Sequence, residues 1–218
     1  MAAARYLKSD GFREYLDSLR FCLYTMRRPL DGFWDLVHEK RGSMAAAHTL
    51  IALTVILQIL GFVLISFQFV NVNMEAFSAY LVILQVLTPI LLWTVANWCL
   101  TTLFDGKGKM SHIYMGIAYA QAPRIIIMAV LIPMSHIITY EEGAIWWTLN
   151  LLGTLWSGVL VLCAMKEIHD YSFGKAIITS ILTIVGIGIL LFIFMMFFAV
   201  VSDGVVYFYS LYQELMYR

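Results

Sequence analysis

The stretch Thr102-Leu103-Phe104-Asp105-Gly106-Lys107-Gly108-Lys109-Met110-Ser111 is a short, charged, glycine-broken link between two long apolar runs. Its lysines, Lys107 and Lys109, predict a cytoplasmic link, because loops that carry Lys or Arg are retained on that side of a membrane. The glycines favour a tight turn between antiparallel helices, and the alternative is a headgroup or partner contact by Asp105, Gly106, Lys107 and Gly108. The orientation of every other segment follows from this link.

The composition of the chain is that of an integral membrane protein. Its 218 residues are 61% hydrophobic and 13% charged, with a mean hydropathy of +0.82. A chain with so few polar groups cannot cover a soluble globule of this size. The formal net charge is zero, which leaves no basic excess for binding nucleic acid. We therefore expect contacts with membrane lipids and no nucleic-acid partner.

The first 43 residues precede any long apolar run and carry eight Lys or Arg and six Asp or Glu. This order differs from that of a cleavable signal peptide, so the first span is expected to be an uncleaved anchor. Apolar residues at three- and four-residue steps predict an amphipathic helix over 9–27, which Pro29 ends. A second helix is expected from Asp31, its N-cap, to Gly42. Residues 1–43 are thus predicted to form a cytoplasmic region that packs beneath the bundle or presents a partner- or lipid-binding surface.

Five later segments reach the roughly 20 apolar residues that a hydrocarbon layer about 30 Å thick requires. Their links are short, so consecutive helices are expected to be antiparallel neighbours. The fold class is therefore predicted to be an all-α membrane protein, a bundle of five transmembrane helices over 44–201, preceded by an N-terminal amphipathic cytoplasmic helix. The predicted spans are Met44–Phe69, Phe77–Leu103, Met110–Ile138, Ala144–Met165 and Lys175–Val201.

Lysine and arginine alternate from link to link. There are eight before the first span and two in the 104–110 link, and Lys166 and Lys175 bound the link before the last span. None occurs in 70–76 or 139–143. This alternation predicts a multi-pass protein of the cell membrane with its N-terminus in the cytoplasm and its C-terminus outside.

Aromatic and acidic residues are expected on the outer side. Trp146 and Trp147 follow the acidic loop and predict an outer interfacial belt. Residues 202–218 form an aromatic tail that is too short and too polar for a sixth span, so we expect it to lie in the outer interface or to dock on a partner. The outer acidic residues are Glu75, Glu141 and Glu142, and the docking candidates are Tyr207, Phe208, Tyr209 and Tyr212.

Arg124 is the only charged residue well inside a predicted span. A charge at membrane depth is usually functional or paired. Pro123 removes one helical hydrogen bond and frees the carbonyl of Tyr119. We expect Arg124 to face the protein interior and to bond to this carbonyl or to Asn97 on the antiparallel second span. With Gln121, these residues form a predicted intramembrane polar cluster that is either structural or lines a ligand or transport path.

No motif for catalysis or metal binding is present in the sequence. The histidines lack a Cys pair or a carboxylate at ligand spacing, and no nucleophile elbow or phosphate-binding glycine loop occurs. The cysteines are expected to be reduced and buried. We therefore predict no metal, no cofactor and no enzymatic activity. The histidines are His38, His48, His112, His136 and His169, and the cysteines are Cys22, Cys99 and Cys163.

Four stretches together resemble the Yip-domain family, namely Pro29–Leu36, Leu103–Gly108, Tyr119–Pro123 and Lys166–Ala176. This family comprises five-span membrane proteins named after Ypt/Rab-GTPase interaction, and the chain is similar to its bacterial branch over about residues 20–201. The resemblance implies a non-enzymatic accessory or scaffold protein that associates laterally with another integral membrane protein or complex, such as a transporter. The alternative is a small permease or lipid-handling protein that uses a polar cavity around Arg124.

Overall fold

The structure is a computed structural model that describes residues 2–69 and 78–217. This part of the chain is all-helical and contains no strand, which confirms the predicted fold class. Glu75 and the predicted start of the second span at Phe77 lie outside the described residues. The helices are α1 (Ala2–Arg27), α2 (Pro29–His38), α3 (Met44–Leu64), α4 (Ala79–Leu103), α5 (Met110–Ala120), α6 (Ala122–Met134), the 3₁₀ turn η2 (Tyr140–Glu142), α7 (Gly143–His169) and α8 (Phe173–Met216).

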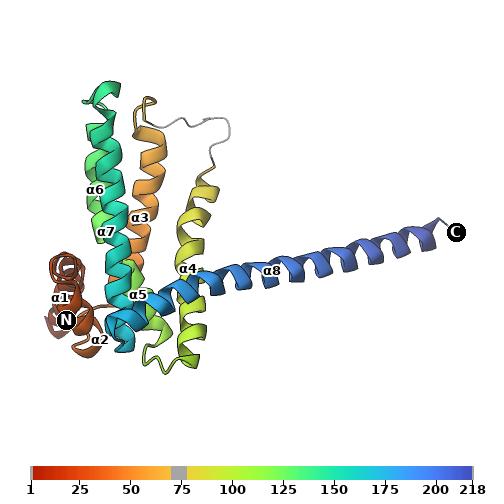
Figure 1. Ribbon diagram of the computed structural model, residues 1–218, viewed down its shortest axis with the longest axis horizontal. Helices are drawn as coiled ribbons and strands as arrows, with labels where there is room; N and C mark the ends of the chain where they lie inside the picture. Colours follow the sequence, from red (N-terminus) through yellow and green to blue (C-terminus); the bar gives the residue numbers. More distant parts are fainter. Residues whose placement is uncertain (1, 70–77, 218) are drawn as a thin grey trace.

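Five helical segments of the described chain are long and apolar enough to cross a membrane. They are α3, α4, α5 with α6, η2 with α7, and α8, in the order that the sequence predicts. Helices α3, α6 and α7 stand side by side with α4 next to them, while α1 lies beside their lower part and is seen nearly end-on (Figure 1). The chain therefore combines an upright bundle with a helix that runs across it at one end.

The N-terminal helices differ in their bounds from the prediction. Helix α1 ends at Arg27, as Pro29 requires, but it begins at Ala2 rather than near residue 9. Pro29 itself opens α2, because the missing N–H of proline is no loss in the first turn of a helix. The N-cap is therefore Arg28, and the prediction of Asp31 is wrong; α2 ends at His38 instead of reaching Gly42.

Helix α5 is the centre of the main core. The seven consecutive positions from Met115 leave only Gln121 partly exposed, and Tyr119 is completely buried. The Tyr119 hydroxyl donates to the carbonyl of Ser18 at 3.0 Å and accepts from the backbone N–H of Ser43 at 3.3 Å. One side chain thus ties α5 to α1 and to the residue that caps α3. Burial raises the pKa of Cys22, on the same inner side of α1.

A smaller core closes the other end of the bundle. Trp146 is 3% exposed, stacks on Phe69 with ring centroids 5.4 Å apart, and donates its indole N–H to the carbonyl of Leu131 at 3.3 Å. The prediction that Trp146 belongs to an interfacial belt is therefore wrong, because its polar atom is satisfied inside the protein. Trp147, the next residue, is 56% exposed, and its place in an outer interfacial belt stays a prediction.

Helix α8 departs most from the prediction. It does not end near Val201 but continues unbroken to Met216, and it leaves the bundle sideways instead of packing antiparallel to α7 (Figure 1). Its buried residues are confined to the first third of the helix: Ala176, Thr179, Ser180 and Thr183. The change of direction occurs at Asp170, whose left-handed conformation (φ 57°) ends α7, and at Ser172, which caps α8.

Candidate functional site

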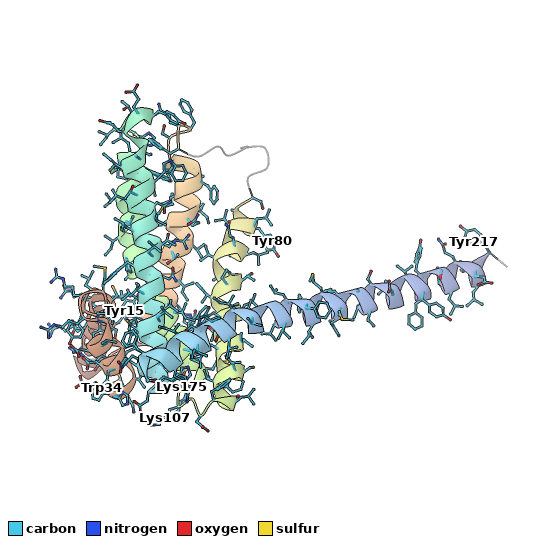
Figure 2. The ribbon with its side chains drawn as sticks, viewed as in Figure 1. Tyr15, Trp34, Tyr80, Lys107, Lys175 and Tyr217 are labelled. Carbon is cyan, nitrogen blue, oxygen red and sulfur yellow. The ribbon has the colours of Figure 1, made fainter. Side chains whose placement is uncertain are left out.

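The charged link between α4 and α5 packs against the turn between α7 and α8. We call this contact the junction cluster (residues 104–109 and 168–175 with Asn97 and Thr183). Asp105 and Asp170 both adopt left-handed backbone conformations, with φ of 55° and 57°, and so reverse the chain on the two sides of the contact. Figure 2 places Lys107 and Lys175 together at this end of the bundle. Lys107 Nζ lies 2.7 Å from Asp170 Oδ2, which lowers the pKa of that exposed carboxyl group by hydrogen bonding and by charge.

His169 is the buried centre of the junction cluster, with an exposed fraction of 1%. Its Nδ1 accepts the backbone N–H of Gly108 at 3.2 Å, and its Nε2 lies 3.0 Å from Asn97 Oδ1. Because Nδ1 accepts a backbone donor, the partners assign a neutral ring with its proton on Nε2. Asn97 then donates from Nδ2 to Thr183 Oγ1 at 3.0 Å. This hydrogen-bonded chain joins the link, α7, α4 and α8.

The carbonyl of Phe104 is a second connection in the cluster. It accepts the Tyr171 hydroxyl at 3.0 Å and Lys175 Nζ at 2.8 Å. Lys175 also lies 4.3 Å from the centre of the Tyr171 ring, and that ring stacks on His169 at 5.3 Å. Burial, and secondly the charge of Asp105, raise the pKa of Tyr171, so its hydroxyl remains a donor across the physiological pH range.

Gly106 and Gly108 are required by space and not by backbone conformation, since neither has a positive φ. A Cβ on Gly106 would lie 2.8 Å from His169 Nδ1 and 2.8 Å from the Tyr171 hydroxyl. A Cβ on Gly108 would lie 2.6 Å from both His169 Cε1 and Ile168 Cγ2. The two glycines let the link approach α7 closely enough for the backbone of Gly108 to reach the histidine.

The junction cluster has the chemistry of a structural contact that holds helices together. Its buried polar atoms at His169, Asn97 and Thr183 are satisfied by one another and by the backbone, as buried networks require. Over residues 2–69 and 78–217, no group of three His, Cys, Asp or Glu residues is placed to hold a metal ion. The cluster fixes where α8 leaves the bundle relative to α4, α5 and α7.

Arg124 lies apart from this cluster, and the prediction for its partners is wrong. Its side chain is exposed, and within the described residues its hydrogen bond goes to Gln58 Oε1 on α3 at 3.3 Å, not to Asn97 or to the carbonyl of Tyr119. Asn97 is committed to His169 and Thr183. The predicted polar cluster of Arg124, Asn97, Gln121 and Pro123 is therefore divided between two places.

A small cavity of about 140 Å³ adjoins Arg124 between α3, α6 and α7. Gln58, Arg124 and Asn150 contribute polar side chains to its lining, and Trp146 closes one side. Pro123 causes a break between α5 and α6. Gln121 lies at this break, since it is both the C-cap of α5 and the N-cap of α6. Pro123 is buried beside this break.

The predicted docking residues lie on the distal part of α8. Tyr207, Phe208, Tyr209 and Tyr212 are between 59% and 69% exposed, and the helix carries them far from the bundle (Figure 2, where Tyr217 marks its end). They belong to a continuous helix and not to a separate tail. The structure thus places the predicted site residues in three separate regions.

Over residues 2–69 and 78–217 the chain is all-helical and has five apolar segments of membrane length, so it is a multi-pass membrane protein. The Yip1 domain model matches residues 23–195, most of the chain, so the protein belongs to the Yip1 domain family. The resemblance seen in the sequence is confirmed at the level of the family. Yip1 is not known as a family of enzymes. No curated protein and no solved structure matches the chain.

Two residues of these sites, His169 and Thr183, were not assigned their roles from the sequence. His169 was considered only as a metal ligand, although it lies within the Lys166–Ala176 stretch that carries part of the family resemblance. Thr183 gave no individual signal. Gln58, as a polar residue inside a span, is expected to bond to a neighbouring helix, but a polar residue in an apolar helix does not indicate which neighbour it will meet. The family stretches were the better guide, since Leu103–Gly108 and Lys166–Ala176 form the two sides of the junction cluster.

Proposed function

We propose that the protein is a non-enzymatic membrane scaffold or accessory protein that associates laterally with another integral membrane protein or complex, such as a transporter. The observation that carries this proposal is the exposed length of α8. Its 44 residues extend about 66 Å at ~1.5 Å per residue, more than twice the ~30 Å of a hydrocarbon layer. Beyond Thr183 none of its described residues is buried against the rest of the chain.

The two ends of this exposed length differ in chemistry. Residues 184–201 are apolar on every side, as suits contact with lipid or with a neighbouring membrane helix. Residues 205–217 are rich in tyrosine, with an apolar ring and a polar hydroxyl, and such residues are enriched at protein interfaces. The aromatic group Tyr207, Phe208, Tyr209 and Tyr212 is therefore our candidate for the docking surface, and the junction cluster is the base that holds it.

The proposal includes the orientation in the cell membrane. Residues 2–43 and the two links that carry lysines gather at one end of the bundle (Figure 1), and by the Lys and Arg rule we assign this end to the cytoplasm. Residues 44–201 would then form the five-span domain, and 202–218 the extracytoplasmic segment. Because α8 runs across α4 (Figure 1) and the junction cluster holds its first part, a fifth crossing requires the part of α8 beyond Thr183 to turn relative to the other spans.

The experiment is purification in mild detergent followed by mass spectrometry of the proteins that remain bound. Wild type is expected to retain a partner in fixed stoichiometry, and a variant with Tyr207, Phe208, Tyr209 and Tyr212 replaced by Ala is expected to lose it. The matched control replaces four exposed apolar residues nearer the bundle on the same helix, Ile189, Phe192, Met196 and Phe197, by Ala and should retain the partner. Wild type that purifies alone, or an aromatic variant that keeps its partner, would refute lateral docking through this segment.

A small permease or lipid-handling protein is the second candidate, and the cavity beside Arg124 favours it. The guanidinium has one hydrogen bond within the described residues and no carboxylate partner there. In a variant without native cysteines, Asn150→Cys should react with a small hydrophilic thiol reagent if the cavity is a water-filled path. Leu151→Cys, on the exposed outer side of α7, is the control and should stay unreactive. Equal reactivity at both positions, or none at either, would exclude this second candidate.

A further inference from the structure

Helix α1 lies beside the lower part of the bundle and is seen nearly end-on where α3, α6 and α7 are seen from the side, so its axis is set crosswise to theirs (Figure 1). It is fixed there by its inner side, where Phe21 and Thr25 are buried. Tyr15 on the same side bonds to Thr49 of α3 at 2.7 Å. One edge of α1 faces the spans, because Met26 lines an apolar pocket with Pro123 and Ile126 of α6. A helix in this position would lie along the membrane surface if the bundle stands upright in the bilayer.

Three arginines form a single stripe on the side of α1 that faces away from the bundle. Arg13, Arg20 and Arg27 follow one another at seven-residue intervals. Each interval is about 20° short of two full helical turns, so the three side chains lie on nearly the same side of α1. All three are exposed. Among the side chains that the structure describes, none of the three takes part in an ion pair. The charge of the stripe is therefore available to a ligand.

The two edges beside the stripe are of opposite character. Leu16 and Leu23, 37% and 47% exposed, lie between the arginines and the edge that carries Met26. Asp17 lies on the other edge, where Asp17 and Arg20 line an open cavity of about 930 Å³ together with Glu14 and residues 39–43. From the spans outward, α1 thus presents leucines, then arginines, then Asp17. An interfacial helix requires this sequence of layers, from hydrocarbon through phosphate to water.

We propose that α1 is an interfacial helix whose Arg13, Arg20 and Arg27 bind the phosphate groups of anionic phospholipids in the adjacent leaflet. Guanidinium groups match phosphate oxygens with paired hydrogen bonds, and a stripe of three spans several headgroups. Leu16 and Leu23 enter the boundary between headgroups and acyl chains beside them. Asp17 lies beyond the arginines, on the edge that borders the open cavity. The proposal is independent of any docking by α8.

The occupant is a lipid surface and not an acidic protein because the leucine edge continues directly onto the spans. Met26 on α1 and Ile126 on α6 share one apolar pocket, so the surface beside the stripe is continuous with surface that hydrocarbon must cover. A protein that bound the arginines would have to cover these leucines at the position where the bilayer ends. Phosphate groups of the bilayer reach the stripe without displacing anything.

The test uses the full chain in detergent micelles that contain equal amounts of phosphatidylglycerol and phosphatidylcholine, with retained lipids counted by native mass spectrometry. Wild type is expected to retain phosphatidylglycerol preferentially. Replacing Arg13, Arg20 and Arg27 by Gln should reduce this preference by about a hundredfold, because each basic residue near an anionic surface contributes about fivefold. Replacement of all three by Lys should preserve most of the preference. Higher salt should weaken it, as for any exposed charge pair.

The matched control removes three other exposed cations, Arg28, Lys40 and Lys109, by substitution with Gln. It should retain phosphatidylglycerol as wild type does. An equal loss in this control would show that total charge and not the stripe is responsible, and would overturn the proposal. So would equal retention of both lipids by wild type, a result that requires no variant to fold. Loss of preference in the Lys variant together with a lowered melting temperature would show a structural role of the arginines and also overturn it.

Discussion

Replacing Gly108 by Ala adds one methyl group at a crowded point of the junction cluster. The new Cβ would lie 2.6 Å from His169 Cε1 and from Ile168 Cγ2, so both side chains must move by roughly 1 Å to reach ordinary contact at 3.4–4 Å. Movement of the histidine stretches its hydrogen bond to the Gly108 backbone and disturbs the bond from its other nitrogen to Asn97. The perturbation therefore acts on packing and on the buried network together.

The expected loss of stability follows from these two effects. Overpacking a close-packed site costs about 1–3 kcal/mol. A buried donor or acceptor left without its partner costs about 1–3 kcal/mol more. Alanine also restricts the unfolded chain, which raises the free energy of unfolding by about 0.4–1 kcal/mol. The free energy of unfolding of Gly108→Ala should thus be lower than that of the wild type by about 2–4 kcal/mol. This is a large share of the ~5–15 kcal/mol that is typical of a folded domain.

The measurement is reversible unfolding in mixed micelles, followed by tryptophan fluorescence. Gly158→Ala is the matched control, because a Cβ at that position on α7 meets no atom within 4 Å. In a helix interior this control should be neutral or more stable by up to about 1 kcal/mol. If Gly108→Ala proves as stable as Gly158→Ala, the close approach of the link to His169 is not what holds this end of the bundle together.

Three further predictions concern the same regions. Thr183→Val should lower the free energy of unfolding by about 1–3 kcal/mol, because it leaves the Asn97 amide without its buried acceptor. The control is Thr102→Val. The Thr102 hydroxyl is exposed and bonds within its own helix, so this variant should have a much smaller effect in the same assay. The Lys107 interaction lowers the pKa of Asp170 below 3.8, so the contribution of the pair is present above pH 3.8 and is lost as the pH falls through the lowered pKa. In Lys107→Gln the NMR titration midpoint of Asp170 should rise toward 3.8, and an unchanged midpoint would contradict the pairing. For the topology, cysteines introduced at Glu142 and Ser210 should react with an impermeant reagent from outside the cell, and reaction only from the cytoplasmic side at Glu142 would reverse the assigned orientation.

The elements of the fold could be predicted because their signals are local. A run of about 20 apolar residues is sufficient to specify a membrane-length helix, so the starts of α3 and α5 at Met44 and Met110 were predicted to the residue. Pro29 and Pro123 break the helices where the missing hydrogen bond requires it. The family stretches also identified both sides of the junction cluster, although not the contact between them.

The partners of the intramembrane polar groups could not be predicted. Arg124 was expected to reach Asn97, but it bonds to Gln58, while Asn97 bonds to His169 and Thr183. Depth along a helix can be counted from the sequence, whereas the direction of a side chain around an apolar helix cannot, because lipid-facing and protein-facing surfaces are equally apolar. Trp146 was misplaced for the same reason.

The sequence alone determined the class of protein, the number and order of its apolar helices and its membership of the Yip1 family, since these depend on composition, segment length and short motifs. Only the tertiary structure decided that α8 is one 44-residue helix that leaves the bundle sideways, and that the arginines of α1 form one outward stripe beside exposed leucines. The direction of α8 is set by contacts over long sequence separations, through Gly108, His169, Asn97 and Thr183. Such contacts depend on how the helices meet in space, which the local pattern of apolar residues does not encode.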